Sequence, residues 1–356
     1  MVGKSPFRRL RPLVIAVLVV ALTTVLAGTA AASHRSSQAR AATPQPLSAA
    51  AWRALVAKAK QEGSVTIYTV SNPTSYANMA AAFKQQYGIT VTVNRQVDNT
   101  LVAQINAEES TGKAVADIWV ATAKQYIYGA LNNRWVVDAV GPSFFSKKFD
   151  RKTFMFGKAW INGEAVLGEA WNTQAYKGSI SGVPDFTSQA FSGKIGVPDP
   201  RVSPSFMDWY LWAEAKWGKG ILAKLAAQHP KIYTSTLPMT QAVASGEIIG
   251  APCAAGTALT LKASGAPIEF KVLPDNWNAP YFGMILKQAP HPAAAQLLAN
   301  YMESPAGQAY VSATAGAIYP NIPNTFYAKP RVQHLNDFTK AKVDAFNAAW
   351  VSLFTH

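Results

Sequence analysis

The chain has 356 residues, 49% of them hydrophobic, with 33 Lys and Arg against 19 Asp and Glu and a formal charge of +14. This composition excludes a disordered chain, and a single cysteine excludes a disulfide framework and Cys-rich metal sites. The length suffices for two ordinary domains with hydrophobic cores. The positive charge first suggests a nucleic acid as the partner.

Residues 1–32 are predicted to form a signal peptide. Basic residues and no acidic ones precede the apolar run 13–27, and small residues follow up to Ala32. This order is typical of a secretory signal cleaved near Ala32, and it predicts export to the periplasm or the extracellular cell envelope. The alternative is an uncleaved anchor, because 13–32 is just long enough to span a bilayer. Residues 33–46 are polar, small and Pro-containing, which predicts a flexible linker.

The charge pattern beyond the signal peptide does not favour nucleic acid. Removing the four basic residues of the first twelve positions lowers the charge from +14 to +10. The remaining lysines are dispersed singly along helix-like stretches, as on a solvated face, and neither an RNA-binding motif nor zinc-finger spacing occurs. We therefore expect no nucleic-acid partner.

The first half of the chain alternates between helix and strand patterns. The amphipathic and β-branched stretches predict helices over 48–62, 75–87 and 100–110, and strands over 65–70, 89–93 and 116–121. Gly63 and Gly88 stand where the first two helices should end, and Ser48 is a candidate N-cap. Strict alternation of this kind favours βα units around a mainly parallel sheet.

The second half of the chain carries shorter and less regular elements. We predict strands over 165–172, 194–198, 248–251 and 269–273, and helices over 204–217, 221–228, 292–302, 305–313 and 329–353. Glycine, serine and proline separate many of these segments. The whole pattern predicts a two-lobed α/β protein.

Five motifs in this order resemble those of one protein family. They are Lys60-Gln-Glu-Gly-Ser-Val-Thr-Ile-Tyr68, Ala116-Asp-Ile-Trp119, Glu169-Ala-Trp-Asn-Thr173, Phe191-Ser-Gly-Lys-Ile-Gly-Val-Pro-Asp-Pro200 and Val243-Ala-Ser-Gly-Glu-Ile-Ile-Gly250. The family is that of the bacterial extracellular (periplasmic) solute-binding proteins of ABC transporters, in the branch that binds ferric iron, thiamine, polyamines and aminophosphonates. The resemblance extends from residue 47 to about residue 323.

This resemblance implies a type 2 periplasmic-binding architecture. Two lobes, each with a mainly parallel sheet flanked by helices, would be joined by two crossover strands and would close on a ligand at the hinge. Lobe one would comprise 47–168 plus 277–356, and lobe two 169–276. The implied partners are a small-molecule solute and the membrane permease of an ABC importer, and we expect a monomer.

Four loops are candidates for contact with the solute. In open α/β sheets, ligands bind beyond the carboxyl ends of the strands, where helix N-termini present free N–H groups. The residues on these loops that can bond a ligand are Ser71, Asn72, Thr74, Asp98, Thr100, Thr122, Ser203 and Ser205. Each alone is an ordinary helix cap, but the four loops together favour a ligand site.

The two expected crossovers add aromatic and amide side chains to the candidate site. Trp171 with Asn172, and Trp277 with Asn278, stand at these positions. Their indoles are either stacking walls for a ligand or packing between the lobes. Tyr281 is a further candidate wall, whereas Trp209 and Tyr210 lie in an apolar helix and favour core positions.

The candidate residues favour an organic anion over a cation or a metal ion. Ferric-iron binders of this family carry adjacent tyrosines where this chain has Pro252-Cys253-Ala-Ala-Gly256. A polyamine needs carboxylates, and only Asp98, Glu169 and Asp199 are candidates. We therefore expect a small anionic or zwitterionic organic solute, without metal or cofactor; ferric iron, thiamine and a polyamine remain the alternative ligands.

No enzyme motif stands in its required context. The sequence Gly218-Lys-Gly-Ile-Leu-Ala223 matches a dinucleotide pattern, but no strand precedes it. Cys253 is flanked by Pro and Ala, which favours a buried structural thiol over a nucleophile. We expect a binding protein and not an enzyme. The alternatives are a secreted hydrolase or transferase with Asp98 or Glu169 as its base, and a cell-surface adhesion or scaffold protein.

Overall fold

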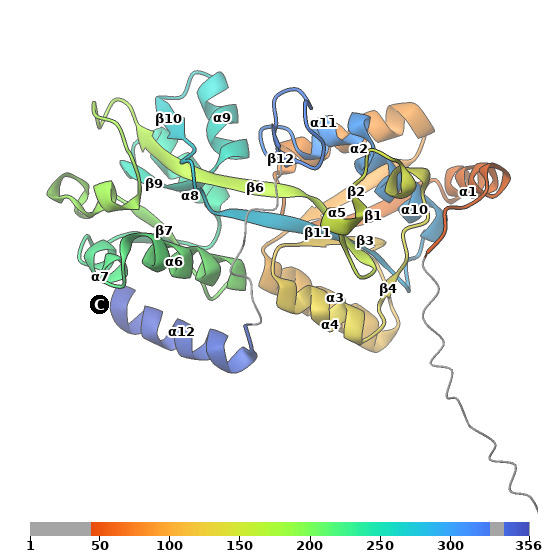
Figure 1. Ribbon diagram of the computed structural model, residues 1–356, viewed down its shortest axis with the longest axis horizontal. Coiled ribbons are helices and arrows are strands. Elements are labelled where there is room, and N and C mark those ends of the chain that lie inside the picture. The colour runs from red at the N-terminus through yellow and green to blue at the C-terminus, as the bar shows by residue number, and fades with distance from the viewer. Residues whose placement is uncertain (1–43, 328–337, 356) are drawn as a thin grey trace, which may run out of the picture. The chain divides into compact units, whose positions relative to one another are not determined.

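The computed structural model describes residues 44–327 and 338–355 (Figure 1). The predicted signal peptide, its cleavage site near Ala32 and most of the predicted linker 33–46 lie outside the described residues. Within the described ranges, no helix has both the length and the apolar character that a membrane crossing requires.

Three parallel strands form the first part of the fold, as the alternating pattern predicts. Strand β1 (Ser64–Thr69) lies between β2 (Thr90–Arg95) and β3 (Ile118–Ala121), and both pairings are parallel. Helices α1 (Ala49–Glu62), α2 (Pro73–Tyr87) and α3 (Asp98–Thr111) occupy the intervening stretches. The predicted βα order is therefore confirmed for this part of the chain.

The ends of these helices follow from single residues. Ser48 caps α1, its Oγ accepting from the Ala51 amide at 3.2 Å, and Gly63 ends the helix with a φ of 72°. That left-handed conformation is open to glycine at little cost. Asn72 caps α2, its Oδ1 accepting from two backbone amides of the first turn, and Gly88 ends that helix in the same way. Both predicted glycine stops are confirmed.

Two long strands connect this sheet to the rest of the chain. Strand β11 (Asn278–Leu286) runs antiparallel between β3 and β6 (Ala159–Asn172). The first part of β6 pairs with β11, and its last six residues pair with β9 (Gly250–Ala254) and β10 (Ile268–Lys271). One 11-stranded sheet therefore continues through β6 into the second lobe, and the predicted crossover strands are β6 and β11 (Figure 1).

The second lobe contains shorter elements around an aromatic core. Strands β7 (Gly196–Pro198) and β8 (Lys231–Tyr233) form a separate parallel pair. The helices of this lobe are α6 (Pro204–Trp217), α7 (Ile221–Ala226), α8 (Thr236–Ser245) and α9 (Ala255–Ala263). Trp209 and Tyr210 of α6 are buried, as predicted, and pack edge to face with ring centroids 4.8 Å apart.

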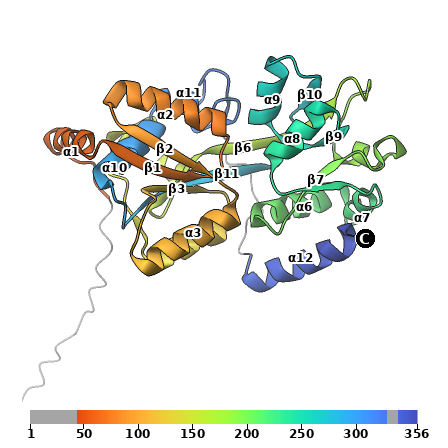
Figure 2. The same cartoon turned by 180° about the vertical axis from the view of Figure 1, so that it is seen from behind.

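The last helix, α12 (Lys340–Phe354), lies beside α6 and α7 of the second lobe (Figures 1 and 2). Its Trp350 and Phe354 are buried against Tyr210, with centroids 6.0 and 5.6 Å away. Residues 277–356 were predicted to belong to lobe one, but α12 packs on the second lobe. The reason is that its aromatic side chains belong to the core of that lobe. The remaining lobe boundaries stay a prediction.

The other elements complete the covering of the sheet. They are α4 (Lys124–Asn132), β4 (Val136–Val137), α5 (Arg151–Phe154), β5 (Met155–Phe156), α10 (Pro292–Met302), α11 (Pro305–Val311), β12 (Gly316–Ala317), β13 (Phe326–Tyr327) and the 3₁₀ turns Pro142–Phe145, Val183–Thr187 and Gln189–Phe191. Helix α10 packs on α1 and β1, so a helix late in the sequence covers the first strand.

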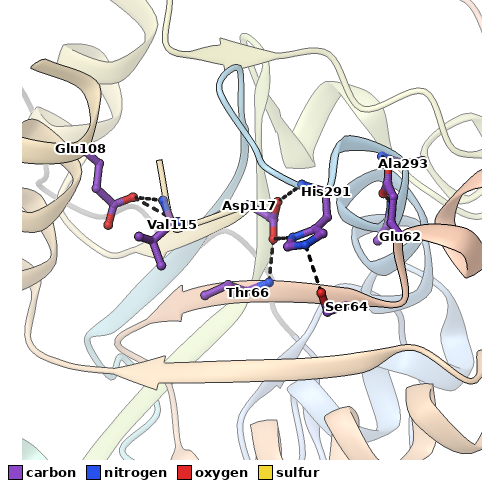
Figure 3. Close-up of polar contacts among 10 residues, drawn as sticks. Glu62, Ser64, Thr66, Glu108, Val115, Asp117, His291 and Ala293 are labelled. Carbon is purple, nitrogen blue, oxygen red and sulfur yellow. Dashed lines mark hydrogen bonds and ion pairs between the residues drawn. The ribbon is translucent and has the colours of Figure 1, made fainter. Parts of the chain in front are cut away.

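A buried carboxylate joins β1, β3 and the start of α10 (Figure 3). Asp117 accepts from the amides of Thr66 at 2.7 Å and His291 at 2.6 Å, and it lies 3.0 Å from His291 Nδ1. The other ring nitrogen of His291 lies 3.0 Å from Ser64 Oγ. Ser64, His291 and Asp117 are not among the residues that line the cleft described below, and we assign them a structural role.

Asp117→Asn is expected to lower the free energy of unfolding by about 2 kcal/mol, since an amide group cannot accept from both backbone N–H groups that the carboxylate satisfies. Urea unfolding followed by circular dichroism measures this change. Asp344→Asn is the matched control, because the Asp344 side chain is 59% exposed and forms an ion pair with Lys340 one turn away. An equal loss in the two variants would contradict the structural role of Asp117.

Candidate ligand-binding cleft

Two adjoining hollows open at the carboxyl ends of β1, β2 and β3. They enclose about 550 and 490 Å³ of empty space, part of it continuous with solvent. Arg95 at the end of β2 and Tyr281 of β11 line both hollows. The facing wall comes from the starts of α6 and α8, so the cleft lies between the two lobes, at the place where open α/β sheets bind ligands.

The two hollows differ in their walls. We call the first the apolar hollow, because its walls include Val97, Leu167, Val202, Phe206, Trp277 and Ala279. We call the second the polar hollow, because Ser71, Asn72, Ser75 and Thr257 line it together with Arg95 and Tyr281.

Seven of the twelve residues predicted from the sequence line this cleft. Ser71 and Asn72 line the polar hollow, and the apolar hollow is lined by Asp98, Thr122, Ser203, Ser205 and Trp277. The predicted loops therefore do converge on one place. Contact of these residues with a solute stays a prediction.

Three of the other five predicted residues have local roles away from the hollows. Thr74 and Thr100 are exposed in the first turns of α2 and α3, and the Thr100 hydroxyl donates to Asn99 at 3.4 Å. Asn172 donates to the carbonyls of Val243 and Ala244 at 2.9 and 3.3 Å, and its Oδ1 accepts from two backbone amides. Asn172 thus fixes the end of β6 to the end of α8.

The aromatic and amide residues of the crossovers separate into core and cleft positions. Trp171 is buried in the core of the second lobe and does not line either hollow. Trp277 lines the apolar hollow, and its indole N–H donates to the buried Asp208 at 2.6 Å. Asn278 is buried, accepts from Asn276 at 2.9 Å and donates to Glu164 at 3.3 Å.

Asp98, Thr122, Ser203 and Ser205 form one hydrogen-bonded network across the cleft. Asp98 accepts from the Thr122 amide at 3.2 Å, from the Thr122 hydroxyl, and from Ser203 Oγ at 2.7 Å. Ser205 Oγ lies 3.0 Å from Thr122 Oγ1. These residues come from α3, from the end of β3 and from the start of α6. The network therefore joins the two lobes in this structure, and burial raises the pKa of Asp98.

Arg95 is the basic group of the cleft, and it was not among the residues predicted from the sequence. Its guanidinium is half-buried, and Nη2 donates to Ser235 Oγ at 2.9 Å. Its Nε is fully shielded and has no hydrogen-bond partner among the described residues. Burial lowers the pKa of Arg95, whereas Tyr281 and Asp98 nearby raise it. A basic residue at the carboxyl end of a predicted parallel strand is the signal that could have identified it.

Hydroxyl groups surround this guanidinium. Ser71 Oγ is buried beside the phenol groups of Tyr76 and Tyr281. Thr234, Ser235 and Thr236 line the cleft at the start of α8, which the sequence analysis did not predict. The Ser-rich turn before a helix was the available signal, and it is the same signal that identified Ser203 and Ser205. Burial raises the pKa of Tyr281 well above its ordinary value, so its phenol stays neutral.

Two of the three candidate carboxylates lie away from the hollows. Asp199 accepts three hydrogen bonds from the Arg201 guanidinium at 2.7–3.1 Å and one from the Arg201 amide, so it stabilises a local turn. Glu169 is fully buried on β6, and burial raises its pKa to about 8. Neither side chain lines the cleft.

Glu169 gives the protein a stability that falls with rising pH. Because its pKa rises from the ordinary 4.5 to about 8, the folded state holds the proton more tightly, and stability is lost between these values. The slope contributed by this group is at most about 1.4 kcal/mol per pH unit. Glu169→Gln is expected to unfold at a higher temperature than the parent at pH 8, and scanning calorimetry at pH 5 and pH 8 measures it. An unchanged pH dependence would contradict the assignment.

Metal-ligand clusters and the reactivity of the cysteine thiol can be assessed for the described residues. Within the described ranges, no cluster of three or more His, Cys, Asp or Glu side chains is placed to hold a metal ion. Cys253 is buried, as predicted, and burial raises the pKa of its thiol to about 12, which keeps it protonated and a poor nucleophile.

Comparison with known proteins identifies the class to which this fold and cleft belong. The family model described as bacterial extracellular solute-binding protein matches residues 65–314, which is more than half of the chain. The chain belongs to this family of extracellular solute-binding proteins. Its members are binding proteins, as the sequence resemblance implied. A search of curated protein sequences found no match.

Solved structures of low sequence identity share the fold. They include AfuA of Actinobacillus pleuropneumoniae with exogenous fructose-6-phosphate bound (21% identity, TM-score 0.66, 82% of this chain and 99% of that chain). Others are the substrate binding protein of an ABC transporter of Agrobacterium tumefaciens (13%, TM-score 0.70, 82% and 94%) and iron-bound HitA of Pseudomonas aeruginosa (17%, TM-score 0.60, 82% and 98%). The two-lobed periplasmic-binding-protein architecture is confirmed.

Proposed function

We propose that this protein captures a small anionic or zwitterionic organic solute by closure of its two lobes and delivers it to the permease of an ABC importer. The anionic class of the ligand is inferred from the position of Arg95 in the cleft. A guanidinium that lines both hollows of a solvent-connected cleft is suited to a carboxylate or a phosphate group.

Neighbouring groups support an anion at this position. The buried Ser71 hydroxyl lines the same cleft, and Thr236 stands at the start of α8, where the helix dipole favours negative charge. The bound fructose-6-phosphate of AfuA is an organic anion held by a protein of the same fold.

The alternative ligands fit the same groups less well. A polyamine or thiamine would place positive charge near Arg95, and Asp98, the carboxylate lining the hollows, already accepts three hydrogen bonds. Ferric iron prefers several charged oxygen ligands, whereas Asp98 is the one carboxylate among the residues that line the two hollows.

The cellular setting follows from the family and the predicted signal. We infer export of the chain to the periplasm or the extracellular cell envelope, with residues 1–32 cleaved near Ala32 and 33–46 as the linker. The description of the family as extracellular supports this localisation. We further infer that the protein acts as a monomer, without enzymatic activity, and that a membrane permease receives the solute.

Ligand identification tests the proposal. Native mass spectrometry of the purified protein should reveal a co-purifying organic anion, and carboxylates or phosphonates should raise the melting temperature in a thermal-shift panel. A ligand at 100 times its Kd stabilises the folded state by about 2.7 kcal/mol, which is readily measured. Stabilisation by a polyamine, thiamine or ferric iron, with none by any organic anion, would refute the anionic class.

A further inference from the structure

We infer that the solute is an organic anion with a compact apolar body, held with its acidic group in the polar hollow and its body in the apolar hollow. This inference rests on the proposed function and narrows its ligand class. It separates such anions from polyhydroxylated ones such as sugar phosphates.

Apolar side chains from several elements form the walls of the apolar hollow. Leu167 of β6, Phe206 of α6 and Trp277 beside β11 come from three different elements and line the same space. Phe206 is half-buried, so part of its ring remains accessible in the cleft. Placing an apolar group in this hollow removes carbon surface of the ligand and of Phe206 from water, at about 25 cal/mol per Å².

Most polar atoms of the apolar hollow already have hydrogen-bond partners within the protein. Asp98, Thr122, Ser203 and Ser205 bond one another, and Ser235 bonds Arg95. The indole N–H of Trp277 donates to Asp208, so the ring offers carbon atoms to the cleft. A ligand hydroxyl in this hollow would lose its water and find few acceptors, which costs free energy.

The position of the Arg95 guanidinium determines the orientation of the bound ligand. Arg95, Thr236 and Tyr281 line both hollows and therefore stand at their junction. Beyond the junction, the Ser71 hydroxyl and the Asn72 amide line the polar hollow. An acidic group fits the side of Arg95 that faces these donors, and the body of the ligand then extends toward Phe206 and Leu167.

Titration calorimetry with matched anions tests the inference. The probes are methylphosphonate and benzylphosphonate, which differ by a phenyl ring, and glucose 6-phosphate, which carries a hydroxylated body of similar size. Benzylphosphonate is expected to bind at least about 10-fold more tightly than methylphosphonate and than glucose 6-phosphate. Acetate and phenylacetate form a second pair in case the acidic group is a carboxylate.

Phe206→Ala is expected to reduce the advantage of benzylphosphonate over methylphosphonate about 10-fold. Tyr128→Ala, an exposed aromatic truncation outside the cleft, is the control. Glucose 6-phosphate binding as tightly as benzylphosphonate would overturn this inference alone, since an anion would still be bound. Failure of every anion in both series would instead overturn the proposed function. The comparison of ligands on the parent protein decides the matter even if the variant does not fold.

Discussion

Arg95→Gln is expected to weaken binding of the organic anion by about 100-fold or more. The substitution removes a charged bidentate donor from a partly shielded site, and truncating one partner of such a pair costs about 2–5 kcal/mol. The melting temperature of the ligand-free protein should not fall, because the guanidinium leaves its Nε without a partner among the described residues and burial disfavours its charge. Calorimetric titration of the parent and variant measures the loss.

Two controls separate the charge from general effects on this protein. Arg53→Gln removes an exposed arginine on α1, away from the cleft, and should leave affinity unchanged. Arg95→Lys keeps the charge but loses the planar fork of donors, so it should recover only part of the affinity. An Arg95→Gln variant that binds the anion as well as the parent does would contradict the assignment of the anionic group to this position.

The first half of the fold could be predicted because its signals are local. The β-branched runs of β1 and β3 and the glycine stops Gly63 and Gly88 each act within a few residues of the chain. The pairings of β6 were less accessible, since its partners lie about a hundred residues away in sequence. The same limit applies to α12, because an aromatic stripe indicates burial but does not indicate which lobe supplies the partner surface.

The candidate site was predictable where helix starts mark it, and less so elsewhere. Arg95 was missed because the predicted strand ended at residue 93, two residues before the observed end of β2. The start of α8 was not predicted, because the preceding strand β8 spans only three residues and gives little periodic signal. Trp171 and Trp277 both stand at crossovers, but side-chain direction on a strand alternates, and only the folded sheet shows that Trp277 reaches the cleft.

Asp98→Ala is expected to weaken solute binding by about 30- to 100-fold, because the substitution disfavours closure of the two lobes. In this structure Asp98 accepts from Thr122 and from Ser203, which belongs to the opposite lobe. Removing the carboxylate leaves buried donors unsatisfied in the closed arrangement, at about 1–3 kcal/mol each, whereas opening returns them to water. The binding-competent closed population falls, and affinity falls with it.

Small-angle scattering of the ligand-free Asp98→Ala variant should show a larger radius of gyration than the parent. Thr100→Ala, at an exposed position on the same helix, is the matched control and should change neither scattering nor affinity. An Asp98→Ala variant with reduced affinity and an unchanged radius of gyration would show that Asp98 contributes other than through closure.

The same carboxyl makes closure depend on pH. Burial raises the pKa of Asp98 above its ordinary 3.8, so the closed state holds the proton more tightly than an open state in which the carboxyl meets water. Closure is therefore favoured as the pH falls, and this contribution is lost as the pH rises through the closed-state pKa. Tyr126 and Tyr281 nearby stay neutral throughout, because burial raises the pKa of both phenols.

With a sulfonate ligand, whose charge does not change, affinity should rise as the pH is lowered from 7 toward 4. This rise should be absent in Asp98→Asn, and a rise of equal size in that variant would assign the pH dependence to another group.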